Sequence, residues 1–408
     1  MVTAIAGGEA DPRAYHALVS DPGPGEDPFR GVPFLGDLAR MLQGQGPLNW
    51  DAARQFALMI ATEGKAETNV DPAVRFRYQE LGRIADLHVQ QATGLDTVAG
   101  GRAAEIVPVT PGIWAQRALD AYRPLFEHLA TTLGGATTPK LDDEQDESLA
   151  MFGGLMQMLS PMMLGMSVGS MVGHLSRRSF GQYDLPIPRP PSSEVQVVTA
   201  TIDQFSDDWS LPIDDLRLWV CLQELTSHAV LNVPHVRAEL EALLTSYVAG
   251  FEPNPDALGD KLAALDPGDA GALPDLQQLL GDPEVLLGAI QSPAQRQLLP
   301  RLDALVAVII GFVDHTVDTA GRGLLATAPR IAEAARRRRV EADQSDIFVE
   351  RLLGLTLTQA AVERGHAFIA GVVERGGDLS RLWTSARALP TPAEVDAPGL
   401  WLARIEYE

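Results

Sequence analysis

The stretch from Ser148 to Ser176 contains no Asp, Glu, Lys or Arg, and it constrains the fold more than any other part of the chain. A segment of this length without charge must either be buried in protein or span a bilayer. Gly165, Gly169 and Gly173 recur at every fourth position, a spacing that lets two helices approach closely. Pro161, several polar side chains and the lack of a second such span all weigh against a membrane helix. We therefore expect a buried helical hairpin, broken at Pro161, in the core of a protein that does not use a membrane.

The charge balance of the chain limits its partners. The 408 residues include 32 Lys and Arg against 54 Asp and Glu, so the net charge is −22, which disfavours binding to nucleic acid or to anionic lipid. The single cysteine, Cys221, can form neither an internal disulfide nor a Cys-rich zinc site, and we expect a buried structural thiol. The first residues show no basic segment followed by an apolar run, so we expect a cytoplasmic protein.

Periodicity along the chain predicts a mostly α protein, of the α+β type, with a small β-sheet. Helices are expected where apolar residues recur at i, i+3 and i+4, with Asn49 and Asp71 opening two of them. The best strand is Val195–Ile202, which is rich in β-branched residues. Trp383 and Trp401 are expected to anchor the C-terminal tail to the body of the protein. The basic run Arg336–Arg339 is expected to be a solvated helix face paired with nearby acids.

The chain divides by composition into four parts. Residues 1–147 are expected to form a helical lobe, after a loosely held lead-in at 1–32 and a short helix at Phe34–Leu42. Residues 148–250 hold the Gly- and Met-rich hairpin, the strand and a central helix. Residues 251–294, with frequent Pro and Gly, predict a loop-rich insertion or lid. Residues 295–408 form a C-terminal helical lobe that begins with a long apolar helix at Gln295–Thr319.

The central helix, Leu216–Ala229, carries the pattern most relevant to chemistry. Its residues Gln223-Glu224-Leu225-Thr226-Ser227 would read H-E-x-x-H if Gln223 and Ser227 were histidines. That motif places two imidazoles one turn apart to bind zinc, with the Glu as general base for water. A carboxamide and a hydroxyl are poor zinc ligands, so only the base position, Glu224, is kept.

Most of the chain resembles a bacterial family of zincin-like proteins that are described as zinc-dependent metalloproteases or hydrolases. Some members carry a label linking them to biosynthesis of a deazaflavin coenzyme. The matching segments are NWDAAR at 49–54, SFGQYDLP at 179–186, DDLRLWVCLQELTSHAV at 214–230, IIGFVDHTVD at 309–318, RRRR at 336–339 and ALPTPAEVDAPGLWLARI at 388–405. The resemblance implies a zincin-like scaffold and a zinc site on the central helix.

The resemblance also implies that this zinc site has degenerated. The family's zinc motif falls on Gln223–Ser227, and its third ligand, the Glu of a Glu-Gly pair, falls on Ile310. A catalytic zinc needs three protein ligands and a water, and all three ligand positions here carry other residues. We therefore expect no cofactor, a relic general base at Glu224, and a non-catalytic binding or structural protein. The relic cleft would hold a peptide or protein segment, and the sequence makes no prediction of the oligomeric state.

The alternative is an active zinc-dependent hydrolase that uses a shifted site. Glu224 and His228 are four residues apart and share a helix face, so both could bind one ion. Asp314, His315 and Asp318 on the later helix could complete its ligands. The competing interpretation is that Glu224 and His228 are buried polar groups, hydrogen-bonded to each other or to the strand. The zinc content of the purified chain distinguishes the two classes of function.

Overall fold

The computed structural model describes residues 46–134, 147–251, 292–340, 350, 352–355 and 357–407, with only the backbone at 133–134, 147–159 and 340. The predicted segments 1–32 and Phe34–Leu42, and nearly all of the predicted insertion 251–294, lie outside these residues. By its internal contacts the chain forms two compact units, residues 1–44 with 141–158 and residues 45–140 with 159–408. The packing described below is that of the second unit.

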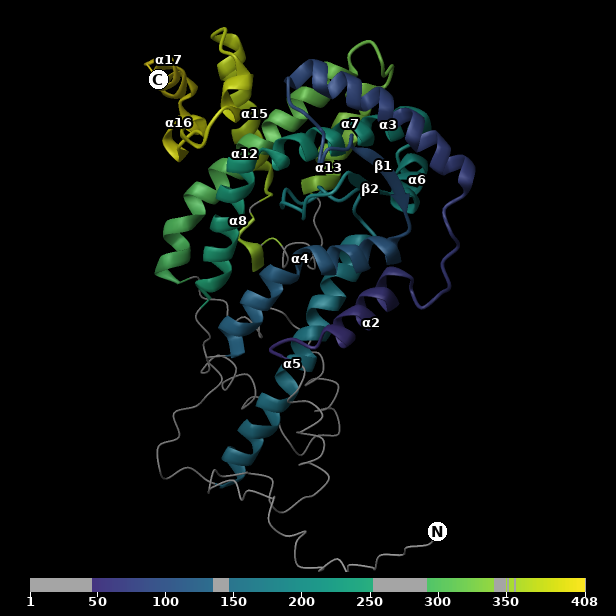
Figure 1. Cartoon of the computed structure of the whole chain (residues 1–408), viewed down its shortest axis with the longest axis vertical. Coiled ribbons are helices and arrows are strands. Elements are labelled where there is room, and N and C mark those ends of the chain that lie inside the picture. Colours follow the sequence, from purple (N-terminus) through teal and green to yellow (C-terminus); the bar gives the residue numbers. More distant parts are fainter. Residues whose placement is uncertain are drawn as a thin grey trace, which may run out of the picture. The chain divides into compact units, whose positions relative to one another are not determined.

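The protein is mostly helical with one small sheet, as predicted. In the first half of the chain the elements are α2 (Trp50–Ala61), α3 (Pro72–Thr93), β1 (Glu105–Val109), α4 (Pro111–Gly134), α5 (Glu147–Ser176), β2 (Glu194–Val198), α6 (Thr199–Asp208), α7 (Ile213–Asn232) and α8 (Pro234–Ala249). In the second half they are α12 (Pro293–Gly321), α13 (Ala328–Val340), α15 (Gln359–Glu374), the short 3-10 helices η1 (Leu379–Trp383) and η2 (Ala386–Ala388), α16 (Pro392–Asp396) and α17 (Pro398–Tyr407). Figure 1 shows this arrangement.

Helix α7 is the central element of the core. It is buried continuously from Leu218 to Leu231, because α3, α12, α8 and β2 all pack against it. A helix covered on every side is usually apolar all round, yet this one also buries five polar residues: Gln223, Glu224, Thr226, Ser227 and His228. Cys221 is fully buried, as predicted. Since buried polar groups need hydrogen-bond partners, these five residues must find theirs within the protein.

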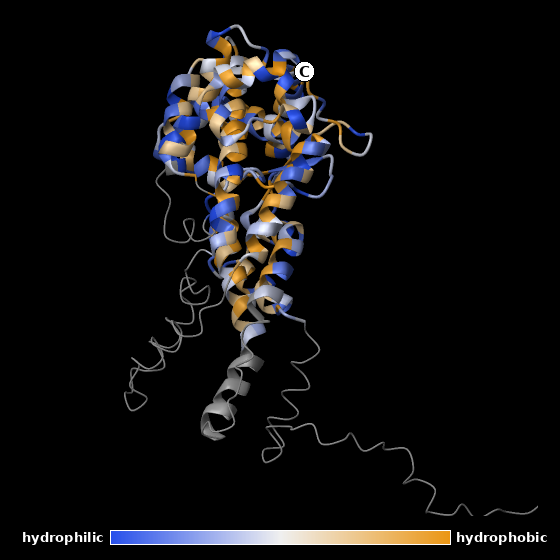
Figure 2. Ribbon diagram, turned by 90° about the vertical axis from the view of Figure 1, so that its left-hand side faces the viewer, coloured by the Kyte–Doolittle hydropathy of each residue, from blue (hydrophilic) through white to orange (hydrophobic). Residues whose placement is uncertain are grey.

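Helix α12 lies beside α7, as predicted for the helix that carries the third ligand position. Ser292 caps its first turn in a capping box with Gln295. On its other side α12 packs closely on α15, where a methyl group added to Gly365 would lie 1.9 Å from the Ala307 carbonyl oxygen. Figure 2 shows hydrophobic residues mostly on the inner faces of the helices and hydrophilic residues mostly on their outer faces. The α12 backbone is thus held from both sides, and Ile310 is fixed next to α7.

The uncharged stretch forms one continuous helix, α5, so the predicted hairpin is wrong. Pro161 lies inside this helix without ending it. Its carbonyl oxygen accepts a hydrogen bond from the Asn49 backbone N–H at 2.9 Å, which ties α5 to the start of α2. The predicted close approach is present, because a methyl group added to Gly169 would lie 2.3 Å from the Ala53 carbonyl oxygen on α2. Among the residues that the structure describes, no helix is both long enough and apolar enough to cross a bilayer.

The predicted strand Val195–Ile202 is only partly correct. Strand β2 ends at Val198, and α6 begins at Thr199 because Ile202, Phe205 and Ser206 recur at helical spacing on a buried face. Strand β2 pairs in parallel with β1, and Ile106 lies opposite Val195. The sequence did not predict β1, which is only five residues long and contains Pro108. The pair places the segment after α5 directly over α7.

The predicted helix caps are confirmed. The Asn49 side chain accepts from the Ala52 N–H at 2.9 Å, and the Asp71 side chain accepts from the Ala73 N–H at 2.7 Å. At the C-terminus Trp383 and Trp401 are buried, and the Trp401 indole donates to the Ala388 carbonyl at 2.7 Å. These aromatic rings hold the tail against α12 and α15, as predicted.

Candidate functional site

The three positions that the resemblance assigned to zinc ligands meet in one small cavity between α7 and α12. Gln223, Ser227 and Ile310 all line this cavity, whose volume is about 20 Å³, room for about one water molecule. Each of the three residues is less than 9% exposed. Gln223 and Ser227 face it from adjacent turns of α7, and Ile310 faces it from α12. The structure therefore brings together the positions that the resemblance assigned to one metal ion.

The side chains at these positions do not form a zinc site. The Gln223 carboxamide oxygen is buried and has no hydrogen-bond partner, Ser227 offers a neutral hydroxyl, and Ile310 offers no donor atom. Zinc in proteins binds imidazole, thiolate or carboxylate groups. Within the described residues no group of three or more His, Cys, Asp or Glu side chains could hold a metal ion. The donors at the inherited position thus do not fit zinc.

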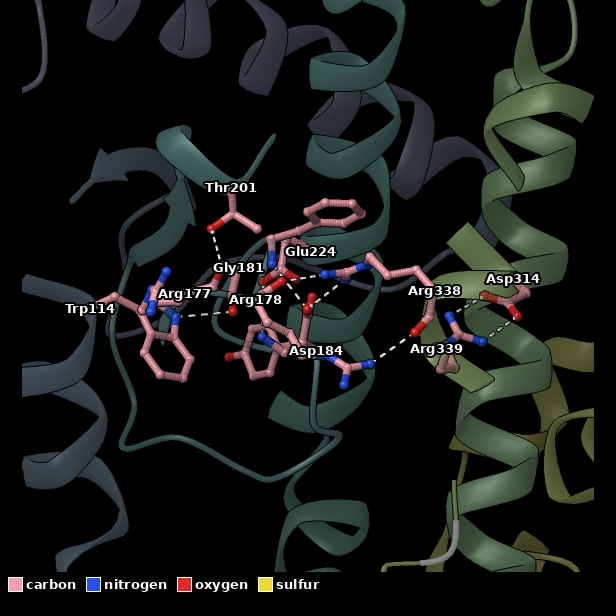
Figure 3. Close-up of polar contacts among 12 residues, drawn as sticks. Trp114, Arg177, Arg178, Gly181, Asp184, Thr201, Glu224, Asp314, Arg338 and Arg339 are labelled. Atoms are coloured by element: carbon pink, nitrogen blue, oxygen red, sulfur yellow. Dashed lines mark hydrogen bonds and ion pairs between the residues drawn. The ribbon is translucent and has the colours of Figure 1, made fainter. Parts of the chain in front are cut away.

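Glu224 lies against the segment that follows α5 and is fully buried. One carboxyl oxygen accepts from the Tyr183 backbone N–H at 3.0 Å, while the other has no partner. A methyl group added to Gly181 would lie 2.2 Å from the Glu224 carboxyl carbon, so glycine is required for this close approach. Burial, together with the charge of Asp184, raises the pKa of Glu224 well above its usual value. Figure 3 shows Glu224 beside Gly181.

His228 is engaged on both ring nitrogens. Nδ1 lies 3.0 Å from the Tyr183 hydroxyl, and Nε2 accepts a hydrogen bond from the Asn232 amide at 2.9 Å. The Asn232 carboxamide is oriented by Arg237, which donates to its oxygen. Burial lowers the pKa of His228 to about 4, so the imidazole is neutral at neutral pH. His228 thus belongs to a hydrogen-bond network that holds Tyr183 on α7, and its ring nitrogens bond to Tyr183 and Asn232 rather than to the Glu224 carboxyl group.

Of the candidates on α12, Asp314 lines the same cavity as Gln223 and Ser227, but its carboxylate is already bound by neighbouring side chains. Asp314 accepts two hydrogen bonds from Arg339, at 2.9 and 3.2 Å, and a third contact, at 2.8 Å, joins it to His366 on α15. Burial alone would raise the pKa of Asp314, but these two partners outweigh it and hold the pKa well below its usual range. Burial lowers the pKa of His315 and raises that of Asp318. Asp318 lines a separate cavity with Trp219, away from Gln223 and Ser227.

The basic run was only half correctly predicted. Arg336 and Arg337 are solvated and pair with Glu333 on the same helix. Arg338 and Arg339 turn inward, where Arg338 binds the Asp184 carboxylate at 2.7 Å and Arg339 binds Asp314. Both line a second cavity of about 50 Å³ that also includes Gln223 and Asp184. Figure 3 shows the two arginines reaching different acids.

Helical spacing in α13 contained a signal for these inward arginines. Ile331 and Ala335 are buried at positions i and i+4, and the next positions on that face, i+7 and i+8, are Arg338 and Arg339. Because four arginines stand in a row, the run looks uniformly solvated in the sequence, and the helical periodicity of its two buried members is not apparent.

Comparison with known proteins agrees with the helical scaffold. Residues 48–402 match the model of a family described as zincin-like metallopeptidase. A crystal structure from Chloroflexus aurantiacus, described as a "putative hydrolase with a novel fold", is similar with a TM-score of 0.58 at 22% identity. The match covers 88% of this chain and 99% of that one, and at this identity it shows the fold alone. No curated protein matches the chain.

Proposed function

We propose, from the premise that the chain belongs to the zincin-like metallopeptidase family, that it is a non-catalytic member that serves as a binding or structural protein. One observation supports this most directly. Gln223, Ser227 and Ile310 line a single cavity, and none of them is a zinc ligand of the kind that catalytic sites use.

The condition of Glu224 supports the same proposal. A catalytic zinc lowers the pKa of its bound water to about 7, so that a nearby carboxylate can act on hydroxide at neutral pH. Without such a metal, Glu224 would have to deprotonate ordinary water, whose pKa is about 15.7. Its own raised pKa favours the protonated acid, and its carboxyl group lies under Gly181 and Tyr183. A carboxyl group enclosed in this way is not placed to act as a base on a substrate.

The relic cleft, by which we mean the two cavities that Gln223 lines, is small. The cavities around Gln223 measure about 20 and 50 Å³, which is far less than a peptide side chain with its backbone requires. A peptide or protein segment could therefore enter only if an element covering these cavities moved. In this structure the relic cleft is part of the packed core between α7 and α12.

Zinc analysis of the wild-type chain and of restored variants tests the proposal. We expect far less than one zinc per chain after purification without chelator or metal-affinity resin. The triple variant Gln223→His, Ser227→His, Ile310→Glu should regain about one zinc per chain, since it restores a three-ligand set. The matched control with Gln223→His, Ser227→His and Ile310→Leu should bind weakly, because it lacks the third ligand.

Two results would contradict the proposal. The first is about one zinc per wild-type chain that survives dialysis and is lost on His228→Ala or Glu224→Ala, which would establish the shifted site. The second is peptide hydrolysis by the wild-type chain that Glu224→Gln abolishes.

A further inference from the structure

Helix α13 borders the two cavities around Gln223 through Ala335, Arg338 and Arg339, and it is held differently at its two ends. Near its N-terminal end, the Thr327 backbone N–H and hydroxyl both donate to Asp215 on α7, at 3.3 and 2.7 Å. Near its C-terminal end, Arg338 binds Asp184 and Arg339 binds Asp314. The first attachment joins α13 to the start of α7. The second joins it to the segment after α5, through Asp184, and to α12, through Asp314.

The apolar face of α13 is unusually small. Its buried residues are Ile331 and the alanines at positions 332, 334 and 335. Burying alanine stabilises a contact by much less than burying leucine or phenylalanine, because stabilisation follows the apolar area removed from water. Moreover, cavities separate α13 from its neighbours: Ala335 and Arg339 line two of them, and Arg339 also lines the third. The helix therefore depends on its two inward arginines more than on apolar packing.

The inward arginines hold the closed form at a cost in solvation. The Arg338 guanidinium lies 3.4 Å from the centre of the Phe180 ring, and its Nε is buried without a partner. It donates to Asp184 and to the Arg178 carbonyl, and the Arg178 guanidinium in turn donates to the Arg338 carbonyl. Partly buried ion pairs give up much of their Coulomb energy to desolvation. An open form would return these groups to water and recover part of that desolvation cost.

We infer that α13 is a lid over the relic cleft, hinged where Thr327 binds Asp215 and latched by Arg338 and Arg339. When the latch releases, the C-terminal half of α13 moves away from α7 and the buried carboxamide of Gln223 meets solvent. Local openings of this kind occur in segments with few buried apolar contacts. The inference does not depend on zinc, so it stands or falls separately from the proposed function.

A thiol placed in the cavity measures the opening. The chain has one native cysteine, Cys221, which is fully buried and whose pKa is raised by burial, so it reports only global unfolding. Gln223→Cys adds a reporter thiol, and its labelling by a maleimide is followed by mass. Arg338→Gln with Arg339→Gln should accelerate reporter labelling at least tenfold. The matched control, Arg336→Gln with Arg337→Gln, removes the same charge from the same helix and should change the rate less than twofold.

Controls and a second measurement keep the inference testable. The latch variant without Gln223→Cys shows whether Cys221 becomes reactive. Equal labelling rates in the latch and control variants, with Cys221 unreactive, would overturn the lid. If the latch variant unfolds, hydrogen exchange of the wild-type chain decides: amides at 335–339 should exchange at least tenfold faster than those at 220–228. Exchange of both segments at one common rate would overturn it.

Discussion

The contact between Gly181 and Glu224 predicts a strong and specific energetic coupling. A methyl group at position 181 would lie 2.2 Å from the Glu224 carboxyl carbon, well inside van der Waals contact. A flexible side chain at the surface could move aside, but Glu224 is fully buried. The Gly181 backbone is also fixed, because its carbonyl accepts from the Trp114 indole at 3.0 Å and it bridges to Val197. Neither partner can yield without disturbing the core.

The magnitude follows from overpacking. Gly181→Ala should reduce the free energy of unfolding by about 1 to 3 kcal/mol, the usual range for extra methyl groups in a packed core. The gain of about 0.4–1 kcal/mol from restricting the unfolded chain partly offsets the clash. Glu224→Ala removes the obstructing carboxyl group, so in that background Gly181→Ala should have little effect. The coupling energy of the double-mutant cycle should therefore be about 1 to 3 kcal/mol.

Urea unfolding of the wild type, both single variants and the double variant measures this cycle. Reversible transitions with equal slopes are needed for the four free energies to be compared. Additive effects, within about 0.5 kcal/mol, would refute the reasoning, because they would mean that Glu224 does not occupy the space beside Gly181.

Three further predictions come from the same region and from the α2–α5 contact. His228 has a pKa of about 4 in the folded protein, so as pH falls through about 6.5 the unfolded chain takes up the proton first. Between pH 7 and 4.5, urea unfolding should therefore show that the free energy of unfolding of the wild type falls by about 2 kcal/mol, a loss that His228→Gln does not show. Burial raises the pKa of Glu224 in the folded protein, so its contribution to stability is fully present below about pH 4.5 and is lost as pH rises. Glu224→Gln should therefore be more stable than the wild type at pH 8 but not at pH 4, and an equal effect at both pH values would contradict the raised pKa of Glu224. Gly169→Leu should lower the melting temperature by several degrees because its Cβ would lie 2.3 Å from the Ala53 carbonyl oxygen, whereas an unchanged value would show that the two helices are not in contact.

Much of the fold followed from local pattern. Asn49 and Asp71 were recognised as helix caps because their side chains accept from N–H groups two or three residues ahead, an interaction set by the adjacent sequence. The close approach at Gly169 followed from glycine spacing, since only a residue without a side chain permits it. The same spacing could not show whether Pro161 breaks a helix or lies within one. That depends on whether tertiary contacts stabilise both halves.

Part of the candidate site could likewise be predicted from the sequence, and part could not. The resemblance of the motif on α7 and of Ile310 to the ligand positions of one ion located the cavity, because the ligands of one ion lie within a few ångströms of one centre. The sequence also shows that these positions carry Gln, Ser and Ile, which are not usual zinc ligands. It did not show that Glu224 is enclosed by Gly181 and Tyr183, which are more than 40 residues away along the chain.

What the sequence by itself determined, then, is the chemistry at each position: helix caps, the glycine contacts, and a motif without metal ligands. What only the tertiary structure decided is the environment of each group. Arg338 and Arg339 are identical in sequence to Arg336 and Arg337, yet two bind buried acids and two face solvent. The pKa shifts of Glu224 and His228 likewise arise from burial by distant segments. Burial and ion pairing are properties of groups brought together in space, and no single stretch of sequence carries them.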